Sequence, residues 1–301
     1  MKLSTKISLM TSIAFIVIGS IMVALGFHYG DRSSFDQIST NSRIVKINSI
    51  NDWEINIANI FNKKVDFDEN ASISSNDSNE VYSISEISNI SIEIGAAKLV
   101  IEDSDDDNIH VSTTGISLNQ IDEDNSNLTI KASGSNIKSA VIISLPSNAS
   151  FNEVEIEAGA AEFNCNCFNC DDFNLNLGAG EAKIQKLIVN NSADIDISAG
   201  DLTIYSGDIN NCDIDLALGN LEFTGTITND LDIDCDMGNT ILTLTDDALD
   251  HNYNLEAGMG NITFEGKQIS GFGNELNQDN NANSNFDIEC GMGNIEINFA
   301  K

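Results

Sequence analysis

Two columns of acidic side chains are the residues in this sequence best placed to do chemistry. They recur within a short phrase in which apolar and polar residues alternate up to a small residue, which we call the anchor. One column lies six residues before the anchor and the other lies four before it. Rows of hard carboxylate oxygens suit Ca²⁺. The candidate calcium ligands are six aspartates in three successive copies: Asp194, Asp196, Asp213, Asp215, Asp232 and Asp234.

A solvated face is the competing interpretation of these columns, and it is the one that we favour. The sequence contains neither an EF-hand loop nor a Gly-Gly-x-Gly-x-Asp repeat. Charged side chains on a sheet keep the protein soluble and discourage pairing with other sheets. The acidic residues 102–107 form a second calcium candidate of the same kind. We therefore expect no cofactor, with calcium as the alternative.

The six cysteines and three histidines do not indicate a catalytic or zinc site. Four cysteines fall at positions where the alternation predicts burial, and there cysteine acts as a small hydrophobe: Cys165, Cys212, Cys235 and Cys290. Cys167 and Cys170 are left as candidates for a disulfide or a thiolate site, and no histidine lies near them in the sequence to complete a zinc site. The histidines are scattered along the chain. We predict no catalytic residues and no enzyme.

The phrase that carries the acidic columns occurs eight times and organises the chain. Two copies have alanine at the anchor, Ala97 and Ala161, and six have glycine: Gly180, Gly200, Gly219, Gly238, Gly260 and Gly293. Successive anchors are separated by 64, 19, 20, 19, 19, 22 and 33 residues. A period near 20 residues is typical of stacked repeat architectures.

The alternation within the phrase predicts an all-β fold. Residues two apart in a strand point to the same side. The positions five and three before the anchor, and two and four after it, are mainly apolar and should fill the interior of coils stacked about 4.8 Å apart. A glycine anchor suits a bend with positive φ, or a bulge, between two strands of one coil. We predict a right-handed β-solenoid or rolled β-sheet with repeats of 19–20 residues.

An apolar segment at the amino terminus predicts a membrane anchor. Residues 7–27 are 21 uncharged positions, preceded by Lys2 and Lys6. About 20 such residues cross a bilayer as a helix, and the preceding positive charges place the amino terminus in the cytoplasm. The alternative is a cleaved signal peptide with its site near residues 24–26. We therefore predict a single-pass plasma-membrane protein whose remaining chain lies outside the cell.

These signals divide the chain into three parts. Residues 1–30 are the cytoplasmic stub and transmembrane anchor, and residues 31–85 are a polar extracellular stalk. Residues 86–301 are the β-solenoid domain. Residues 267–284 interrupt the last two copies with polar residues and glycine, so we expect an extruded loop there.

The net charge narrows the choice of partners. It is -33, with 14 basic against 47 acidic residues. Nucleic-acid binding needs basic side chains that displace counterions, so this sequence excludes it. A basic protein or a cell-wall or other glycan ligand is the kind of partner we expect.

From residue 86 to 300 the sequence resembles a bacterial family of candidate adhesins built from β-strand repeats. The matching features are Ile-Glu-Ile-Gly-Ala-Ala-Lys-Leu at residues 92–99, an acidic turn before His110, and Val-Ile-Ile-Ser-Leu-Pro at residues 141–146. Repeats with Ala or Met before Gly-Asn or Gly-Asp complete the pattern. The resemblance implies a membrane-tethered surface β-solenoid without catalytic residues, and a link of some members to envelope stress.

Three functions follow, in order of preference. The first is a non-catalytic binding or adhesion module at the cell surface, which uses the flat solenoid faces and residues 267–284. The second is an envelope-stress or signalling accessory protein that acts through membrane partners. The third is a carbohydrate-active β-helix enzyme, which the scarcity of basic groups disfavours because few are available to stabilise developing negative charge.

Overall fold

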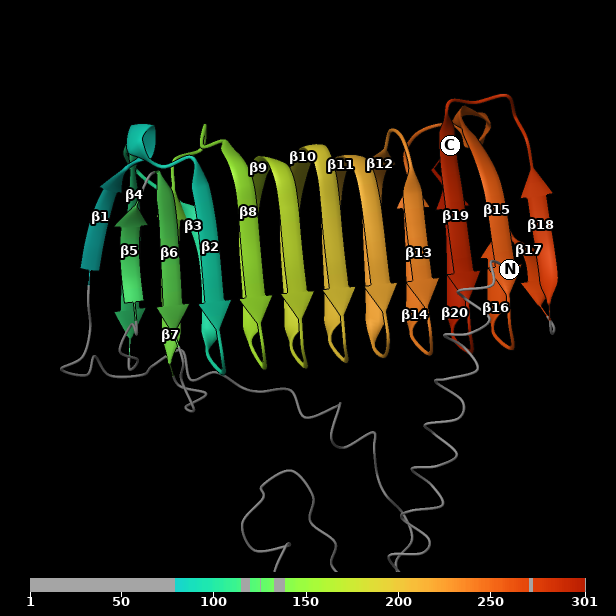
Figure 1. Cartoon of the computed structure of the whole chain (residues 1–301), viewed down its shortest axis with the longest axis horizontal. Coiled ribbons are helices and arrows are strands. Elements are labelled where there is room, and N and C mark those ends of the chain that lie inside the picture. The colour runs from blue at the N-terminus through green and yellow to red at the C-terminus, as the bar shows by residue number, and fades with distance from the viewer. Residues whose placement is uncertain (1–78, 115–119, 125, 133–138, 271–272, 301) are drawn as a thin grey trace, which may run out of the picture. The chain divides into compact units, whose positions relative to one another are not determined.

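The computed structural model describes residues 79–114, 120–124, 126–132, 139–270 and 273–300, all within the compact unit Phe67–Lys301 (Figure 1). The predicted membrane segment 7–27 and most of the predicted stalk lie outside these residues. In the described part of the chain, no helix is long and apolar enough to span a membrane. The prediction of a transmembrane anchor is therefore untested.

The described residues are almost entirely β-structure, which confirms the predicted all-β fold. Two 3-10 helices, η1 Ile84–Glu86 and η2 Ala248–Asp250, accompany twenty strands in one sheet system. The strands are β1 Asn79–Ser83, β2 Asn89–Ile94, β3 Lys98–Asp103, β4 Asn108–Thr114, β5 Gln120–Asp124, β6 Asn127–Ala132, β7 Ala140–Leu145, β8 Phe151–Ala158, β9 Glu162–Leu177, β10 Glu181–Ile197, β11 Asp201–Leu216, β12 Asn220–Ile227, β13 Leu231–Cys235, β14 Asn239–Leu244, β15 His251–Ala257, β16 Asn261–Phe264, β17 Lys267–Ser270, β18 Asn274–Gln278, β19 Ser284–Cys290 and β20 Asn294–Phe299.

The strands form two faces around one core. Face A holds the residues before each anchor, and its strands lie in the order β5, β6, β2, β8, β9, β10, β11, β13, β19, β15, β18. Face B holds the residues after each anchor, in the order β1, β4, β7, β3, β9, β10, β11, β12, β14, β20, β16, β17. The long strands β9, β10 and β11 contribute to both faces. One repeat is therefore one coil, as predicted, whereas the right-handed sense stays a prediction.

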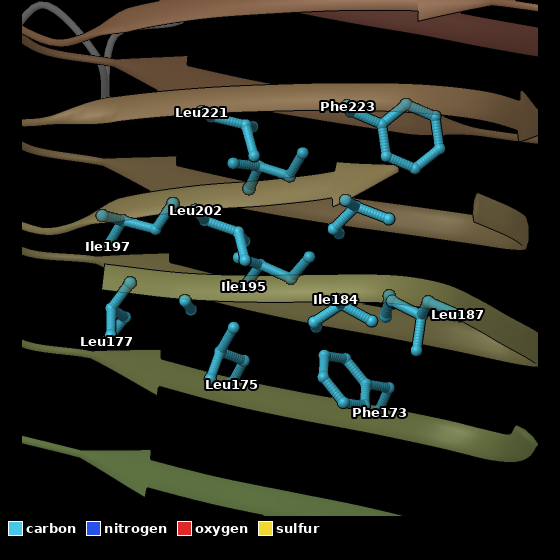
Figure 2. Close-up of a cluster of buried hydrophobic side chains, with 14 of the residues drawn as sticks. Phe173, Leu175, Leu177, Ile184, Leu187, Ile195, Ile197, Leu202, Leu221 and Phe223 are labelled. Atoms are coloured by element: carbon cyan, nitrogen blue, oxygen red, sulfur yellow. The ribbon is translucent and has the colours of Figure 1, made fainter. Parts of the chain in front are cut away.

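Apolar columns fill the space between the two faces. Leu175, Ile195 and Ile214 lie side by side in the parallel register and are buried. Figure 2 shows Leu175 and Ile195 of this column, with Leu202 of face B beside Ile195. Full burial of such a side chain stabilises the fold by about 1.5–3 kcal/mol. The columns predicted from the alternation are the observed core.

The spatial order of the coils departs from their order in the sequence at both ends. The last coil, β19–β20, pairs with β13–β14 on one side and with β15–β16 on the other. Likewise, β2–β3 lies between β6–β7 and β8–β9. At the carboxyl-terminal end the chain thus leaves one coil's width open after β13–β14 and fills it last with β19–β20. At the amino-terminal end β2–β3 comes first, and the chain adds a coil on either side of it (Figure 1).

Antiparallel strands cap both ends of the stack, and they correct two predictions. Residues 267–284 are not an extruded loop: β17 pairs with β16 on face B, and β18 pairs with β15 on face A. Polar residues fit there because the outermost strands are open to solvent, while Ile269 faces the core. At the other end, β1 pairs with β4, so ordered structure starts before residue 86, inside the predicted stalk. A polar sequence can form β1 because the strand lies at the edge of the sheet, where its backbone pairs with β4 and its side chains meet solvent.

Candidate binding surface

The acidic columns predicted from the sequence lie in register on face A, with asparagine at both positions of β9. In spatial order, the column six residues before the anchors contains Glu155, Asn174, Asp194, Asp213, Asp232, Asp287 and Asn254. The column four residues before them contains Glu93, Glu157, Asn176, Asp196, Asp215, Asp234, Glu289 and Glu256, and Glu275 of the cap strand β18 extends it. We call these two rows the acidic columns.

The insertion of β19 concentrates charge at one point of the acidic columns. Glu289 lies in register between Asp234 and Glu256. The pKa of Glu289 is raised to about 7, mainly by partial burial and to a smaller extent by repulsion from Asp234 and Glu256. No inspection of neighbouring repeats in the sequence would bring Glu289 beside Asp234, because the copy anchored at Gly260 separates their copies.

The same two effects act on the pKa values of the central aspartates. Burial first, and then neighbouring carboxylates, raise the pKa values of Asp213, Asp215 and Asp234. At the far end of the columns the charge is balanced, because Lys131 Nζ lies 2.8 Å from Glu93 Oε2. Asn254 donates a hydrogen bond to Asp287 at 2.8 Å. The strongest unfavourable electrostatics therefore lie over β11, β13 and β19.

The six calcium candidates lie on three adjacent strands, two on each of β10, β11 and β13. The structure brings them together as two rows on a flat face. Among the described residues, no group of three or more His, Cys, Asp or Glu side chains is arranged to hold a metal ion. Calcium binding by these residues stays the untested alternative to a solvated face.

The glycine anchors lie at the turns where face A passes into face B. Their main requirement is close approach between coils, and positive φ is the exception. Gly219 alone among the six has a positive φ, at 116°. A Cβ on Gly200 would lie 2.8 Å from the Gly180 carbonyl oxygen, and a Cβ on Gly219 would collide with that of Gly200. The positive φ expected from the sequence is therefore found only at Gly219, and at the other glycine anchors the close neighbouring coil leaves no room for a Cβ.

The structure assembles a histidine cluster that sequence spacing did not reveal. His251 is buried, with Nδ1 2.6 Å from Ser284 Oγ and Nε2 2.9 Å from Asp246 Oδ2. Its ring stacks on Phe286, with centroids 4.1 Å apart. Ser284 comes from the inserted strand β19, so only the folded coil order brings these residues together.

This Ser–His–Asp arrangement is not set up for nucleophilic catalysis. The Ser284 hydroxyl donates its proton to the Asn229 carbonyl oxygen. Ser284 is also buried, and a hydroxyl whose proton is held by a backbone carbonyl has none to pass to His251, as catalysis by a general base requires. The cluster instead ties β19 to the coils on either side of it.

The cysteines are all free thiols, and five of the six are buried. Burial raises the pKa of Cys170 to about 12, and its thiol points to the Ile188 carbonyl oxygen at 3.8 Å. Cys170, which the sequence left as a candidate thiolate, is therefore a core residue. Cys167 is half-buried, and burial raises its pKa as well. These environments favour neutral thiols over metal-binding thiolates.

Residues 121–298 match the family described as Toastrack DUF4097. This chain belongs to the Toastrack family. The match spans more than half of the chain, and it confirms the predicted relationship to bacterial β-strand-repeat proteins. No curated protein matches the sequence.

Solved structures with a similar arrangement come from several bacteria. A candidate cell adhesion protein from Clostridium sporogenes is 13% identical, with 74% of this chain and 99% of that chain covered and a TM-score of 0.31. A candidate adhesin from Bacteroides fragilis is 11% identical, with 74% and 97% covered and a TM-score of 0.38. A candidate lipid-binding protein from Parabacteroides distasonis is 15% identical, with 74% and 97% covered and a TM-score of 0.33.

Proposed function

We propose that this Toastrack protein is a non-catalytic binding module displayed on the outer surface of a bacterium. In this proposal, residues 7–27 span the plasma membrane with the amino terminus in the cytoplasm. The following polar residues hold the coils, wound in a right-handed sense, away from the membrane. The supporting sequence feature is the length of the apolar segment behind Lys2 and Lys6, since about 20 such residues cross a bilayer.

The acidic columns are the observation that carries the proposal. Carboxylates opposite each other on a sheet repel, and this destabilises the fold. The raised pKa values of Asp213, Asp215 and Glu289 record that repulsion together with burial. A cationic partner would relieve it on binding and would be attracted from a distance. We therefore propose a basic protein or a cell-wall or other glycan ligand that carries amines.

Display of the full chain on intact cells tests this function. A carboxyl-terminal epitope tag should be accessible to antibody and to added protease without lysis. Cells that express the chain should bind to surfaces coated with basic matrix proteins or with peptidoglycan more strongly than cells that lack it. Because electrostatic attraction is screened, the excess binding should fall as NaCl rises.

A matched pair of variants assigns the binding to face A. Asp213→Asn with Asp215→Asn should reduce the excess binding severalfold. Asp105→Asn with Asp107→Asn removes the same charge from the exposed acidic turn between β3 and β4 and should leave binding unchanged. Equal losses in both would show non-specific attraction, and an inaccessible tag would contradict surface display.

The alternative proposal is an envelope-stress or signalling accessory protein that acts through membrane partners. The family resemblance and the apolar segment 7–27 support it. Its partners would still co-purify with a variant whose acidic columns are neutralised. They would no longer co-purify with a variant in which an unrelated membrane span replaces residues 7–27. The surface-binding proposal expects the opposite pattern.

A further inference from the structure

The two lines of turns that join face A to face B have opposite chemistry. At the turns that contain the anchors, the residue before each anchor is apolar and points away from the core. In spatial order these residues are Ala96, Ala160, Ala179, Ala199, Leu218, Met237, Met292 and Met259. We call this row the apolar ridge. It runs along the lower edge of the stack in Figure 1, where the face A strands end.

Backbone hydrogen bonds hold the ridge residues in register. Met237 N donates to Ala217 O at 3.0 Å, and Met292 N donates to Asp236 O at 2.6 Å. Met259 N donates to Gly291 O, also at 2.6 Å. Neighbouring ridge residues are therefore separated by about one strand spacing, roughly 4.8 Å. The row is a fixed part of the fold.

The large members of the ridge are exposed. The exposed fractions are 38% for Leu218, 42% for Met237, 39% for Met292 and 57% for Met259. The whole chain has six methionines, and the three that follow residue 22 all lie here. A row of large apolar side chains on a highly charged protein marks an interaction site.

The opposite edge serves as an internal comparison, since the same coils pass between the two faces there with polar residues, in β9, β10 and β11 without a break in the strand. Asn190 donates to Asp171 at 3.2 Å, and Asn229 donates to Asn210 at 2.6 Å. Asn191 donates to Asp172 at 2.6 Å. These side chains satisfy one another from coil to coil. A turn edge in this fold can therefore be polar and self-contained, so coiling does not require the apolar ridge.

Charge beside the ridge indicates the partner's chemistry. On the face A side, three residues before the ridge, lie Asp215, Asp234, Glu289 and Glu256 of the acidic columns. On the face B side, the strands begin with asparagines: Asn220, Asn239, Asn294 and Asn261. A ligand lying on the ridge thus meets thioethers beneath it, carboxylates on one flank and neutral amides on the other.

We propose that the apolar ridge is the docking site for an amphipathic helix of a partner protein, with basic residues along one flank of the helix. Flexible methionine side chains adapt to such helices. A helix advances about 5.4 Å per turn, close to the coil spacing of about 4.8 Å. One apolar residue per turn can therefore contact one coil. This inference rests on the proposed binding function and names the partner class.

The charge of the chain argues against the other occupants. A second copy would bring two chains of net charge -33 together. An anionic lipid surface would meet the same repulsion. A cationic helix is attracted by the flank that repels both.

Binding of a designed peptide to the full chain tests the proposal. The probe is a fluorescent 18-residue amphipathic helix of leucine and lysine, with the lysines on one flank; a scrambled peptide of equal composition is the control. The full chain is held in nanodiscs of zwitterionic lipid, and binding to empty discs is subtracted. Methyl-labelled methionine NMR spectra locate the contact, because Met1, Met10 and Met22 act as internal references.

The expected result separates the apolar ridge from the acidic columns. The helix should bind and should shift the methyl signals of Met237, Met292 and Met259. Met237→Lys with Met292→Lys should weaken binding about tenfold or more, as loss of a binding hot spot does. Val81→Lys replaces an apolar residue of similar exposure, 55%, on β1 and should have no effect. Circular dichroism melts check that each variant is folded.

Other outcomes overturn the inference in distinguishable ways. The acidic columns act alone if the scrambled peptide binds as well as the helix, or if Asp215→Asn with Asp234→Asn is the only variant that weakens binding. In either case the ridge proposal fails and the proposed function survives. Self-association that Met237→Lys abolishes would make a second copy the occupant. Loss of binding to neutral vesicles in the same variant would make lipid the occupant. If no peptide binds while the cell-surface binding persists, the ridge has no role in it.

Discussion

Glu289 lies directly opposite Asp234 in the parallel pairing of β13 with β19, although a complete coil and a cap come between them in the sequence. On its other side Glu289 lies opposite Glu256. The centre of the acidic columns is thus made by a strand that returns into the stack, and this has consequences for stability.

We expect Glu289→Gln to stabilise the protein above neutral pH. Partial burial and the neighbouring carboxylates raise the pKa of Glu289 from its ordinary value of 4.5 to about 7. The folded state therefore holds more protons than the unfolded state between these values, so stability falls as pH rises from about 4.5 to about 7. Solvent screening at this partly exposed side chain limits the gain to about 1 kcal/mol.

Melting temperatures at pH 5 and pH 8 check this prediction. The glutamine variant should gain stability at pH 8 and much less at pH 5. Glu222→Gln is the matched control, since Glu222 lies on face B between Thr203 and Ile241. Equal gains in the two variants would mean that overall charge, and not the position beside Asp234, sets the effect.

We expect calcium to stabilise the chain no more than sodium does at equal ionic strength. The six candidate aspartates on β10, β11 and β13 form two rows, and a row of carboxylates is screened by any cation. Calorimetric titration of CaCl₂ into the full chain, with thermal melts in CaCl₂ and NaCl, tests this. Micromolar binding heat that Asp213→Asn with Asp215→Asn removes would establish the calcium site instead.

Gly219→Ala should cost about 3 kcal/mol or more of stability. A Cβ at this position would collide with the Gly200 carbonyl oxygen of the adjacent coil, and φ is 116°. Moving packed backbone to relieve such a clash is destabilising. Gly266→Ala is the control, because φ is 74° but nothing lies within 4 Å of the added Cβ.

Denaturant unfolding of both alanine variants separates close approach from backbone strain. The Gly266 variant should lose only about 1 kcal/mol, the cost of a left-handed residue. If the two losses were similar, positive φ alone would explain the Gly219 anchor.

His251→Ala should destabilise the protein by about 1–3 kcal/mol, the usual cost of leaving a buried hydrogen-bonding group without its partner. It leaves the Asp246 carboxylate, which is 14% exposed, without the ring nitrogen that lies 2.9 Å away. It also removes the ring that Phe286 of β19 stacks on.

His110→Ala provides the matched control in this case. His110 Nε2 lies 2.9 Å from Asp106 Oδ1, the same distance, but that pair is open to solvent. Its loss should leave the melting temperature within error. Hydrogen exchange should also show that β19 opens more readily in the His251 variant; unchanged protection of β19 would show that the cluster does not hold this strand.

The repeat made the interior and the acidic columns predictable. Burial at Ile195, Ile214 and Ile233 follows from period-two alternation, and so does exposure of the aspartates between them. The residues before the anchors were also visible in the sequence as Leu218, Met237, Met259 and Met292. The exposure of these side chains could not be predicted, because the alternation of buried and exposed positions stops at a turn.

The neighbours of each coil could not be read from the repeat. Ile233, Ile288 and Leu255 occupy the same position in their copies. An apolar column built from them would therefore be equally well packed whichever order their strands took. The structure places Ile288 between the other two. Residues 267–284 were misjudged for a related reason: their polar composition fits an exposed loop and an outermost strand equally well.

The sequence by itself determined the coil: its length, its buried positions, its glycine turns and the charge of face A. These depend on alternation and local geometry, which repeat identically in each copy. The tertiary structure alone decided the order of the coils and the caps that end them, and thereby placed Glu289 beside Asp234 and Ser284 beside His251. Equivalent copies offer nearly equal pairing surfaces, so their order depends on contacts between residues distant in the sequence, which no local pattern encodes.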